Sequence, residues 1–126
     1  MLRYTVIALF AITAPFAAAQ QQEGSATAVV CKAIENNSCE GADTTFPNGV
    51  GKLWGFSQVV NVPDRIVHVW YYRGRELGRI PMNAPNAPRW KTWSNVTVAK
   101  NMIGPWKLEV RDASGKVLAA FDFKIE

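Results

Sequence analysis

The sequence has few of the side chains from which most active sites and metal sites are built. Its 126 residues include one histidine and two cysteines, whereas a structural zinc site takes three or four nitrogen and sulfur ligands. It contains no phosphate-binding P-loop, no dinucleotide-binding glycine pattern and no G-x-S-x-G nucleophile motif. No spacing among its 10 acidic residues singles out a catalytic carboxylate pair. We therefore expect no metal, no cofactor and no enzymatic activity.

The chain also has only a small excess of one sign of charge. The chain has 14 Lys and Arg against 10 Asp and Glu, for a net charge of +4, and the basic residues are scattered among acidic ones. Proteins that bind nucleic acid through its phosphates gather Lys and Arg into a stripe or patch. The sequence therefore predicts no nucleic-acid partner.

A hydrophobic run long enough to cross a bilayer, about 20 residues, is missing. Arg3 precedes a short apolar run over Tyr4–Ile12, and Ala17-Ala18-Ala19 fits the small-residue cleavage pattern of a secretory signal peptide. We predict that residues 1–19 are a signal peptide cleaved after Ala19, with an uncleaved membrane anchor as the alternative. The mature chain would then be periplasmic or secreted and would contain no membrane span.

The two cysteines, Cys31 and Cys39, lie eight positions apart. In an oxidising compartment an isolated pair at this spacing indicates a local disulfide. Zinc binding is the alternative, and the ligand count disfavours it. We predict a disulfide that stabilises the domain by about 2–3 kcal/mol in the chain-entropy model.

The mature chain shows no sustained helical periodicity, and its apolar residues instead alternate with polar ones. Residues 20–25 are polar and predict a flexible lead-in, after which residues 26–126 suffice for a single domain. Tight turns are expected at Arg73-Gly74 and at Asp112–Gly115. The strands are expected at residues 26–35, 53–62, 65–73, 76–82, 90–99, 106–111 and 117–125, with a long loop over residues 36–51. This pattern predicts an all-β fold, an immunoglobulin-like antiparallel sandwich of two sheets and about seven strands.

The segment Arg65–Arg73 is unusual because both of its faces are apolar. A sandwich strand normally exposes its outer face to water. Monomeric proteins rarely leave an apolar patch of this kind uncovered, so we expect a loop to cover the outer face, with a partner protein as the alternative.

His68 is the only histidine, and any histidine-dependent general base must be this residue. A hydrolase would need a serine or cysteine nucleophile beside it and a carboxylate to orient it. Buried polar groups are usually satisfied by structural partners. The sequence therefore favours a buried histidine bonded to backbone or carboxylate, with a hydrolase that uses His68 as the alternative.

The segment Arg89–Ser94 carries two tryptophans beside two basic residues. On a strand, Trp90 and Trp93 project to opposite faces, which predicts that one is core and the other lies at an edge or surface. An exposed indole beside Arg89 or Lys91 can stack on a sugar ring or engage acidic groups; the alternative is that both indoles are buried or edge-packed. The candidate binding surface comprises His68, Trp70, Tyr72, Arg89, Trp90, Lys91 and Trp93.

The span from Cys31 to Phe123 resembles the bacterial domain-of-unknown-function 2914 family. The most specific segments are His68-x-Trp70-Tyr71-Tyr72-x-Gly74 and Trp90-Lys91-Thr92-Trp93-Ser94; Ile34-Glu35-Asn36, Phe46-Pro47, Leu53-Trp54-x-Phe56-Ser57, Gly104-x-Trp106 and Asp112-x-x-Gly115-x-Val117-Leu118 add to them. Lys91 stands where the family has arginine. The resemblance implies an exported or periplasm-facing bacterial domain and supplies no activity.

Together these observations predict a non-enzymatic binding or interaction module of the bacterial cell envelope. Envelope polysaccharide and envelope protein are the expected classes of partner. The alternatives are an envelope hydrolase that uses His68 and a purely architectural subunit of an envelope complex.

Overall fold

The computed structural model describes residues 24–85 and 87–126. The predicted signal peptide, residues 1–19, and all but the last two residues of the predicted lead-in lie outside the described residues. The strands are β1 (Ser25–Cys31), β2 (Ala33–Glu35), β3 (Ser38–Glu40), β4 (Thr45–Phe46), β5 (Gly51–Val60), β6 (Arg65–Tyr72), β7 (Arg75–Asn83), β8 (Arg89–Val98), β9 (Gly104–Asp112) and β10 (Val117–Ile125). This part of the chain contains no helix with the length and hydropathy of a membrane span.

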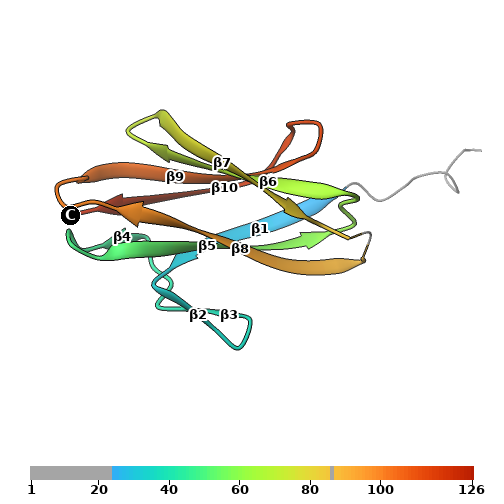
Figure 1. The fold of residues 1–126 in the computed structure, drawn as a ribbon, viewed down its shortest axis with the longest axis horizontal. Helices are drawn as coiled ribbons and strands as arrows, with labels where there is room; N and C mark the ends of the chain where they lie inside the picture. Colours follow the sequence, from blue (N-terminus) through green and yellow to red (C-terminus); the bar gives the residue numbers. More distant parts are fainter. Residues whose placement is uncertain (1–23, 86) are drawn as a thin grey trace, which may run out of the picture.

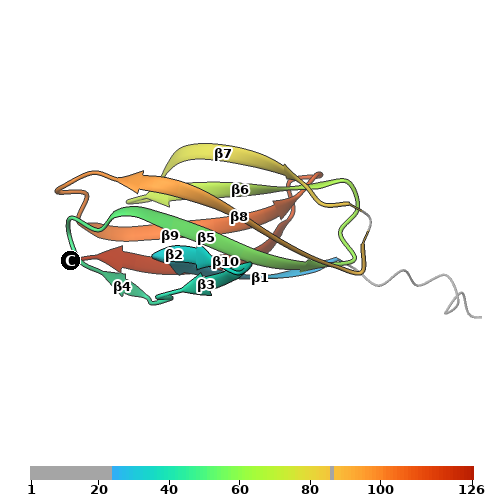
Figure 2. The same cartoon turned by 60° about the horizontal axis from the view of Figure 1, so that its bottom comes forward.

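The strands form two packed sheets and a separate hairpin (Figures 1 and 2). One sheet has the order β1-β5-β8, the other has the order β4-β10-β9-β6-β7, and β2 pairs with β3. All pairings are antiparallel except the short parallel contact between β4 and β10. Among the described strands, seven have seven residues or more. Numbered in chain order, these seven run 1-2-5 in one layer and 7-6-3-4 in the other, which is an immunoglobulin-like arrangement and confirms the predicted fold class.

Two hairpin turns follow the sequence-based expectations. Arg73 and Gly74 join β6 to β7 and have φ angles of 50° and 76°, as a two-residue turn with the twist of the flanking strands requires. Between β9 and β10, the Asp112 carboxylate accepts hydrogen bonds from the backbone N–H groups of Ser114 and Lys116. Gly115 has a φ of 91° there, which glycine adopts without strain.

The predicted first strand, residues 26–35, is wrong in its extent. The chain leaves the sheet after Cys31 and forms the β2–β3 hairpin, which Figure 1 shows standing away from the sandwich on the side of β5. Asn36 and Asn37 form the hairpin turn with φ angles of 50° and 58°. Asparagine tolerates positive φ better than most residues, so Asn-Asn takes the place of the more familiar Asn-Gly. The disulfide between Cys31 and Cys39, predicted from spacing, is confirmed and joins β1 to β3.

Two apolar clusters fill the space between the sheets. Trp70 and Ile66 lie in different clusters, although they are only four residues apart on β6, and His68 lies between them. The larger cluster contains Val30, Phe46, Leu53, Trp70, Val98, Trp106, Leu108, Phe123 and Ile125, and the smaller one contains Val59, Val62, Ile66, Ala84 and Val110.

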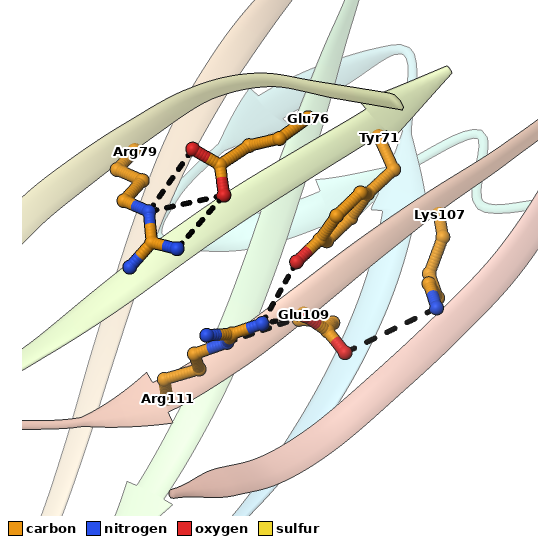
Figure 3. A network of polar contacts seen from close by, with 6 residues as sticks. All are labelled: Tyr71, Glu76, Arg79, Lys107, Glu109 and Arg111. Atoms are coloured by element: carbon orange, nitrogen blue, oxygen red, sulfur yellow. Dashed lines mark hydrogen bonds and ion pairs between the residues drawn. The ribbon is translucent and has the colours of Figure 1, made fainter. Parts of the chain in front are cut away.

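The outer face of β6 is covered by side chains and not by the loop that the sequence predicted. Val69 lies on this face, between Arg79 of β7 and Glu109 of β9 in the register of the sheet, and is fully buried. The Arg111 guanidinium donates to the Glu109 carboxylate at 2.6 Å and to the Tyr71 hydroxyl at 2.7 Å (Figure 3). Long charged side chains from the neighbouring strands thus shield the apolar residues of β6 from water.

Gly55 of β5 leaves the room that the core tryptophan occupies. A Cβ atom at this position would lie 2.7 Å from Cζ2 of Trp70 and 2.6 Å from Cδ2 of Leu108. Both of those side chains are buried, with little freedom to move. The absence of a side chain at Gly55 therefore sets how closely the two layers approach.

We expect Gly55→Ala to lower the free energy of unfolding by about 1–3 kcal/mol, because it overpacks a filled core. Gly78→Ala on β7 is the matched control, since a Cβ there meets nothing within 4 Å. That variant should be neutral or slightly more stable. Urea unfolding of both variants measures the difference, and equal midpoints would show that the contact at Gly55 does not limit packing.

The disulfide generates a second prediction about stability. Replacing both Cys31 and Cys39 by alanine should cost about 2–3 kcal/mol, because the closed loop of nine residues gains freedom mainly in the unfolded chain. Urea unfolding of this variant should match that of the wild-type protein in reductant. In this variant, backbone amide hydrogens should exchange faster in β2 and β3 than in the two sheets. A double variant as stable as the oxidised wild type would contradict the prediction.

Candidate functional site

A chain of polar side chains crosses the interior between the two sheets. His68 of β6 lies 2.8 Å from the Ser57 hydroxyl of β5 through Nε2 and 2.6 Å from the Ser94 hydroxyl of β8 through Nδ1. The Trp70 indole N–H donates to the same Ser94 oxygen at 3.1 Å. His68, Ser57 and Trp70 are at most 1% exposed, and Ser94 is 6% exposed. The histidine therefore connects the two layers.

The groups at the two ends of this series, the Trp70 indole and the Thr92 carbonyl, determine the direction of the hydrogen bonds between them. The Trp70 indole can only donate, and at the other end the Ser57 hydroxyl lies 3.5 Å from the Thr92 carbonyl, which can only accept. If the hydrogen of His68 is on Nε2, Trp70 donates to Ser94, Ser94 to Nδ1, Nε2–H to Ser57, and Ser57 to the carbonyl. In the other tautomer, with the hydrogen on Nδ1, the Ser94 hydroxyl hydrogen has no acceptor among these hydrogen-bonded side chains. We therefore assign the hydrogen to Nε2.

Burial of these hydrogen-bonded side chains keeps the His68 imidazole neutral. Burial lowers the pKa of His68 from 6.5 to about 4. Both ring nitrogens are bonded to serine hydroxyls, so the partner that the sequence favoured, backbone or carboxylate, is replaced by two serines. Buried side-chain nitrogen and oxygen atoms of the described residues all have a partner.

Two members of the predicted binding surface are therefore placed wrongly by the sequence. His68 and Trp70 are buried between the layers and cannot contact a ligand. Tyr72 lies at the far end of β6, where its ring packs on Trp106 and its hydroxyl donates to the Ile103 carbonyl. The alternation along β6 was read correctly, but it points these side chains inward and not to a surface.

The other four members, Arg89, Trp90, Lys91 and Trp93, lie together at one end of β8. Trp90 is 40% exposed and Trp93 is partly buried, so the expectation that one of the two indoles is core is wrong. The Trp93 ring stacks on Phe56 of β5, with ring planes 8° apart and centroids 6.1 Å apart. This stacking holds one face of the indole against the sheet.

These residues line a hollow of about 800 Å³. Its walls come from β5, from the end of β8 and from the turn of the β2–β3 hairpin, and the lining residues are Asn37, Gln58, Val59, Val60, Arg89, Trp90, Lys91 and Trp93. The volume lies within the range of about 300–1,000 Å³ that small-molecule sites occupy. We call this the outer hollow.

A second hollow of about 540 Å³ lies between β8 and β7 and is called the inner hollow. It is lined by Pro81, Met82, Asn83, Trp90, Lys91, Thr92 and Trp93. The Thr92 hydroxyl contacts the Met82 sulfur at 3.2 Å across the two layers. Trp90, Lys91 and Trp93 therefore belong to both hollows.

The lining of both hollows is aromatic, amide-rich and cationic. No acidic side chain is among the lining residues of either one. Within the described part of the chain, Arg89 and Lys91 form no ion pair. No group of three or more His, Cys, Asp or Glu residues that could hold a metal ion occurs among the described residues either.

Sequence reasoning missed the part of the site that comes from other segments. Asn37 reaches the outer hollow only because the disulfide-linked hairpin folds toward β5. Met82 and Asn83 reach the inner hollow because β7 and β8 are end strands of different sheets that face each other. No local sequence pattern predicts either juxtaposition; the Asn36-Asn37 pair, which tolerates positive φ, is the one signal that could have placed a hairpin turn there.

These features define the chain as an immunoglobulin-like β-sandwich domain with an aromatic and cationic site at one lateral edge. A family model described as "Protein of unknown function (DUF2914)" matches residues 63–125. The match covers half of the chain, so the chain belongs to this family. It includes β6 to β10, and with them the two most specific segments of the predicted resemblance, His68–Gly74 and Trp90–Ser94. The segments of that resemblance that precede residue 63 lie outside the match.

Comparisons with other proteins add the following likenesses. No curated protein matches the sequence. The CARDB domain of a Pyrococcus furiosus protein, solved in complex with di-metal ions, is 12% identical, and the aligned region covers 82% of this chain and 92% of that chain with a TM-score of 0.48. A β-glucosidase from Kluyveromyces marxianus is 9% identical with a TM-score of 0.48, and the alignment covers 82% of this chain but only 14% of that one. Neither likeness bears on function.

The buried histidine predicts how stability depends on pH. The pKa of His68 is about 4 in the folded protein and about 6.5 in the unfolded chain, so unfolding takes up a proton between these values. Its contribution to stability is fully present above pH 6.5 and is lost as the pH falls toward 4. Between pH 7 and pH 5 we expect a loss of about 2 kcal/mol.

Urea unfolding measured between pH 5 and pH 7 tests this expectation, because most carboxylates stay ionised there. His68→Gln should flatten the pH dependence, whatever it does to stability itself. A wild-type protein whose stability is constant over this range would show that the pKa of His68 is not lowered by the fold.

Proposed function

We propose that this protein is an exported, non-enzymatic binding module of the bacterial cell envelope whose ligand is a polysaccharide. The observation that carries the proposal is the outer hollow, where two tryptophans, two cations and two amide side chains converge. Indole rings stack on the apolar faces of sugar rings, and amides pair with sugar hydroxyls in both directions. Of the two predicted classes of partner, polysaccharide suits this lining better than protein.

Export is supported by the disulfide and by the first 19 residues. A disulfide between Cys31 and Cys39 persists in oxidising compartments and is rare in the cytosol. The signal peptide predicted at residues 1–19 agrees with that compartment. The periplasm or the cell exterior is therefore the location that we propose.

We propose a non-enzymatic module because the candidate nucleophile and the candidate base are both buried. Ser57 and His68 are 2.8 Å apart, as a hydrolase dyad would be. Both are fully buried, and neither lines the outer or the inner hollow. The second histidine nitrogen contacts a serine and not the carboxylate that would orient a catalytic base. The dyad is better explained as part of the core.

Co-sedimentation with peptidoglycan and other wall polysaccharides purified from bacterial envelopes tests the proposed function. Trp93→Ala should weaken binding by about tenfold or more, because a central tryptophan contact is commonly worth over 1.4 kcal/mol.

The control is Trp54→Ala. Trp54 lies on the same outer face, also two residues after a lysine, with the Lys52 ammonium 5.8 Å from its ring, but it lines neither hollow. It should bind like the wild type, and thermal melts verify that both variants fold. Failure to sediment with any polysaccharide, or equal binding by the two variants, would overturn the proposal.

A further inference from the structure

We infer that the polysaccharide is acidic and that it lies as an extended chain across the free edge of β8, from the outer hollow into the inner hollow. This inference rests on the proposed function, because it specifies the ligand of the same site. It is carried by the continuity of the two hollows, by the openness of the edge between them and by the charge of their lining.

The continuity follows from the shared residues. Trp90, Lys91 and Trp93 line both hollows, which have volumes of about 800 and 540 Å³. Each volume by itself lies in the range that takes one drug-sized ligand. A site made of two such hollows that meet at the same three side chains suits a ligand longer than one or two sugar units.

The edge between the hollows is open in the described structure. β8 is the last strand of the sheet β1-β5-β8, and β7 is the last strand of the other sheet. Figures 1 and 2 show the two strands on the same lateral side of the sandwich, in different layers. A linear ligand can therefore pass from the outer face, around β8, to the space between β7 and β8 without crossing a strand.

The charge of the lining selects an acidic chain. Arg89 and Lys91 lie two residues apart on β8, which separates them by about 7 Å along the strand. Neither forms an ion pair within the described residues, and no carboxylate lines either hollow. Two unpaired cations at this spacing suit acidic groups on nearby units of one chain.

Polar groups occur in both hollows as a sugar chain requires. The outer hollow has the amides of Asn37 and Gln58, and the inner hollow has the amide of Asn83 and the hydroxyl of Thr92. Amides and hydroxyls both donate and accept, which matches the hydroxyl groups of sugars. Each half of the proposed path therefore offers stacking and hydrogen bonding together.

Single-stranded nucleic acid is the other polyanion that stacks on aromatic side chains. It fits less well, because such binders gather many cations along the path of the backbone. Here Arg89 and Lys91 are the only basic residues that line the two hollows, and the whole chain has a net charge of +4. An oligonucleotide is therefore included in the test as the competing ligand.

The test measures binding of oligogalacturonides, from monomer to octamer, to the full mature chain by calorimetry. Malto-oligosaccharides of the same lengths are the neutral series, and oligothymidylate is the nucleic-acid probe. Affinity should rise by about tenfold or more from dimer to hexamer and then level off. The acidic oligomers should bind about tenfold more tightly than the neutral ones, and raised salt should reduce this difference.

Two variants and one control separate the parts of the inference. Lys91→Gln should remove most of the preference for acidic oligomers, whereas Lys52→Gln, which changes a lysine outside both hollows, should keep it. Asn83→Ala should weaken binding of long oligomers by severalfold and leave the short ones unchanged, because only long chains reach the inner hollow.

The possible failures are distinguishable. Equal affinity for acidic and neutral oligomers, or affinity independent of length, overturns this inference and leaves the proposed function in place. Tighter binding of oligothymidylate than of any oligosaccharide overturns both, and so does the absence of binding to every oligosaccharide when wall polysaccharide also fails to sediment the protein.

Discussion

The fold depends on one buried connection, the hydrogen bonds that run from Trp70 through Ser94 and His68 to Ser57. Hydrophobic burial is not directional, so apolar burial alone specifies the register of two sheets less sharply than contacts between particular polar atoms. Hydrogen bonds require particular atoms to meet, and an unpaired buried polar group costs about 1–3 kcal/mol. Because His68 bonds to two neighbouring strands of the opposite sheet, a shift of either strand breaks the chain. The core is thereby held in one register.

This register also determines which side chains β8 displays. Ser94 must point into the core to reach His68, and side chains alternate along a strand, so Trp93 points outward onto Phe56. Thr92 likewise points inward to Met82, which leaves Lys91 on the outer face. The short segment Trp90–Ser94 therefore serves both purposes: Ser94 bonds to His68 in the core, whereas Lys91 and Trp93 on the outer face line the hollows together with Trp90.

The period-two alternation made the fold largely predictable, and β9 and β10 carry it most clearly. The turns at Arg73-Gly74 and Asp112–Gly115 were predictable because few residues accept their backbone angles. The break after Cys31 was missed, since Val, Cys and Ile continue a strand-like pattern across it. His68 and Trp70 were assigned to a surface because a sequence shows that two residues share a face but not which face is covered. The inner hollow was beyond reach, because it depends on β7 and β8 meeting across different sheets.

The position of the site at a sheet edge has a physical reason of its own. An exposed edge strand offers unpaired backbone groups to other chains, and proteins protect such edges with charged residues, lysine in particular, and with proline. β8 carries Arg89 and Lys91 at its open end, and β7 carries Pro81 on the facing edge. Charge that discourages pairing with another strand would at the same time favour the acidic ligand that we propose, so the edge can remain open without becoming a site of aggregation. The same residues meet both requirements, which explains how a small sandwich can place two adjoining hollows where strand pairing would otherwise occur.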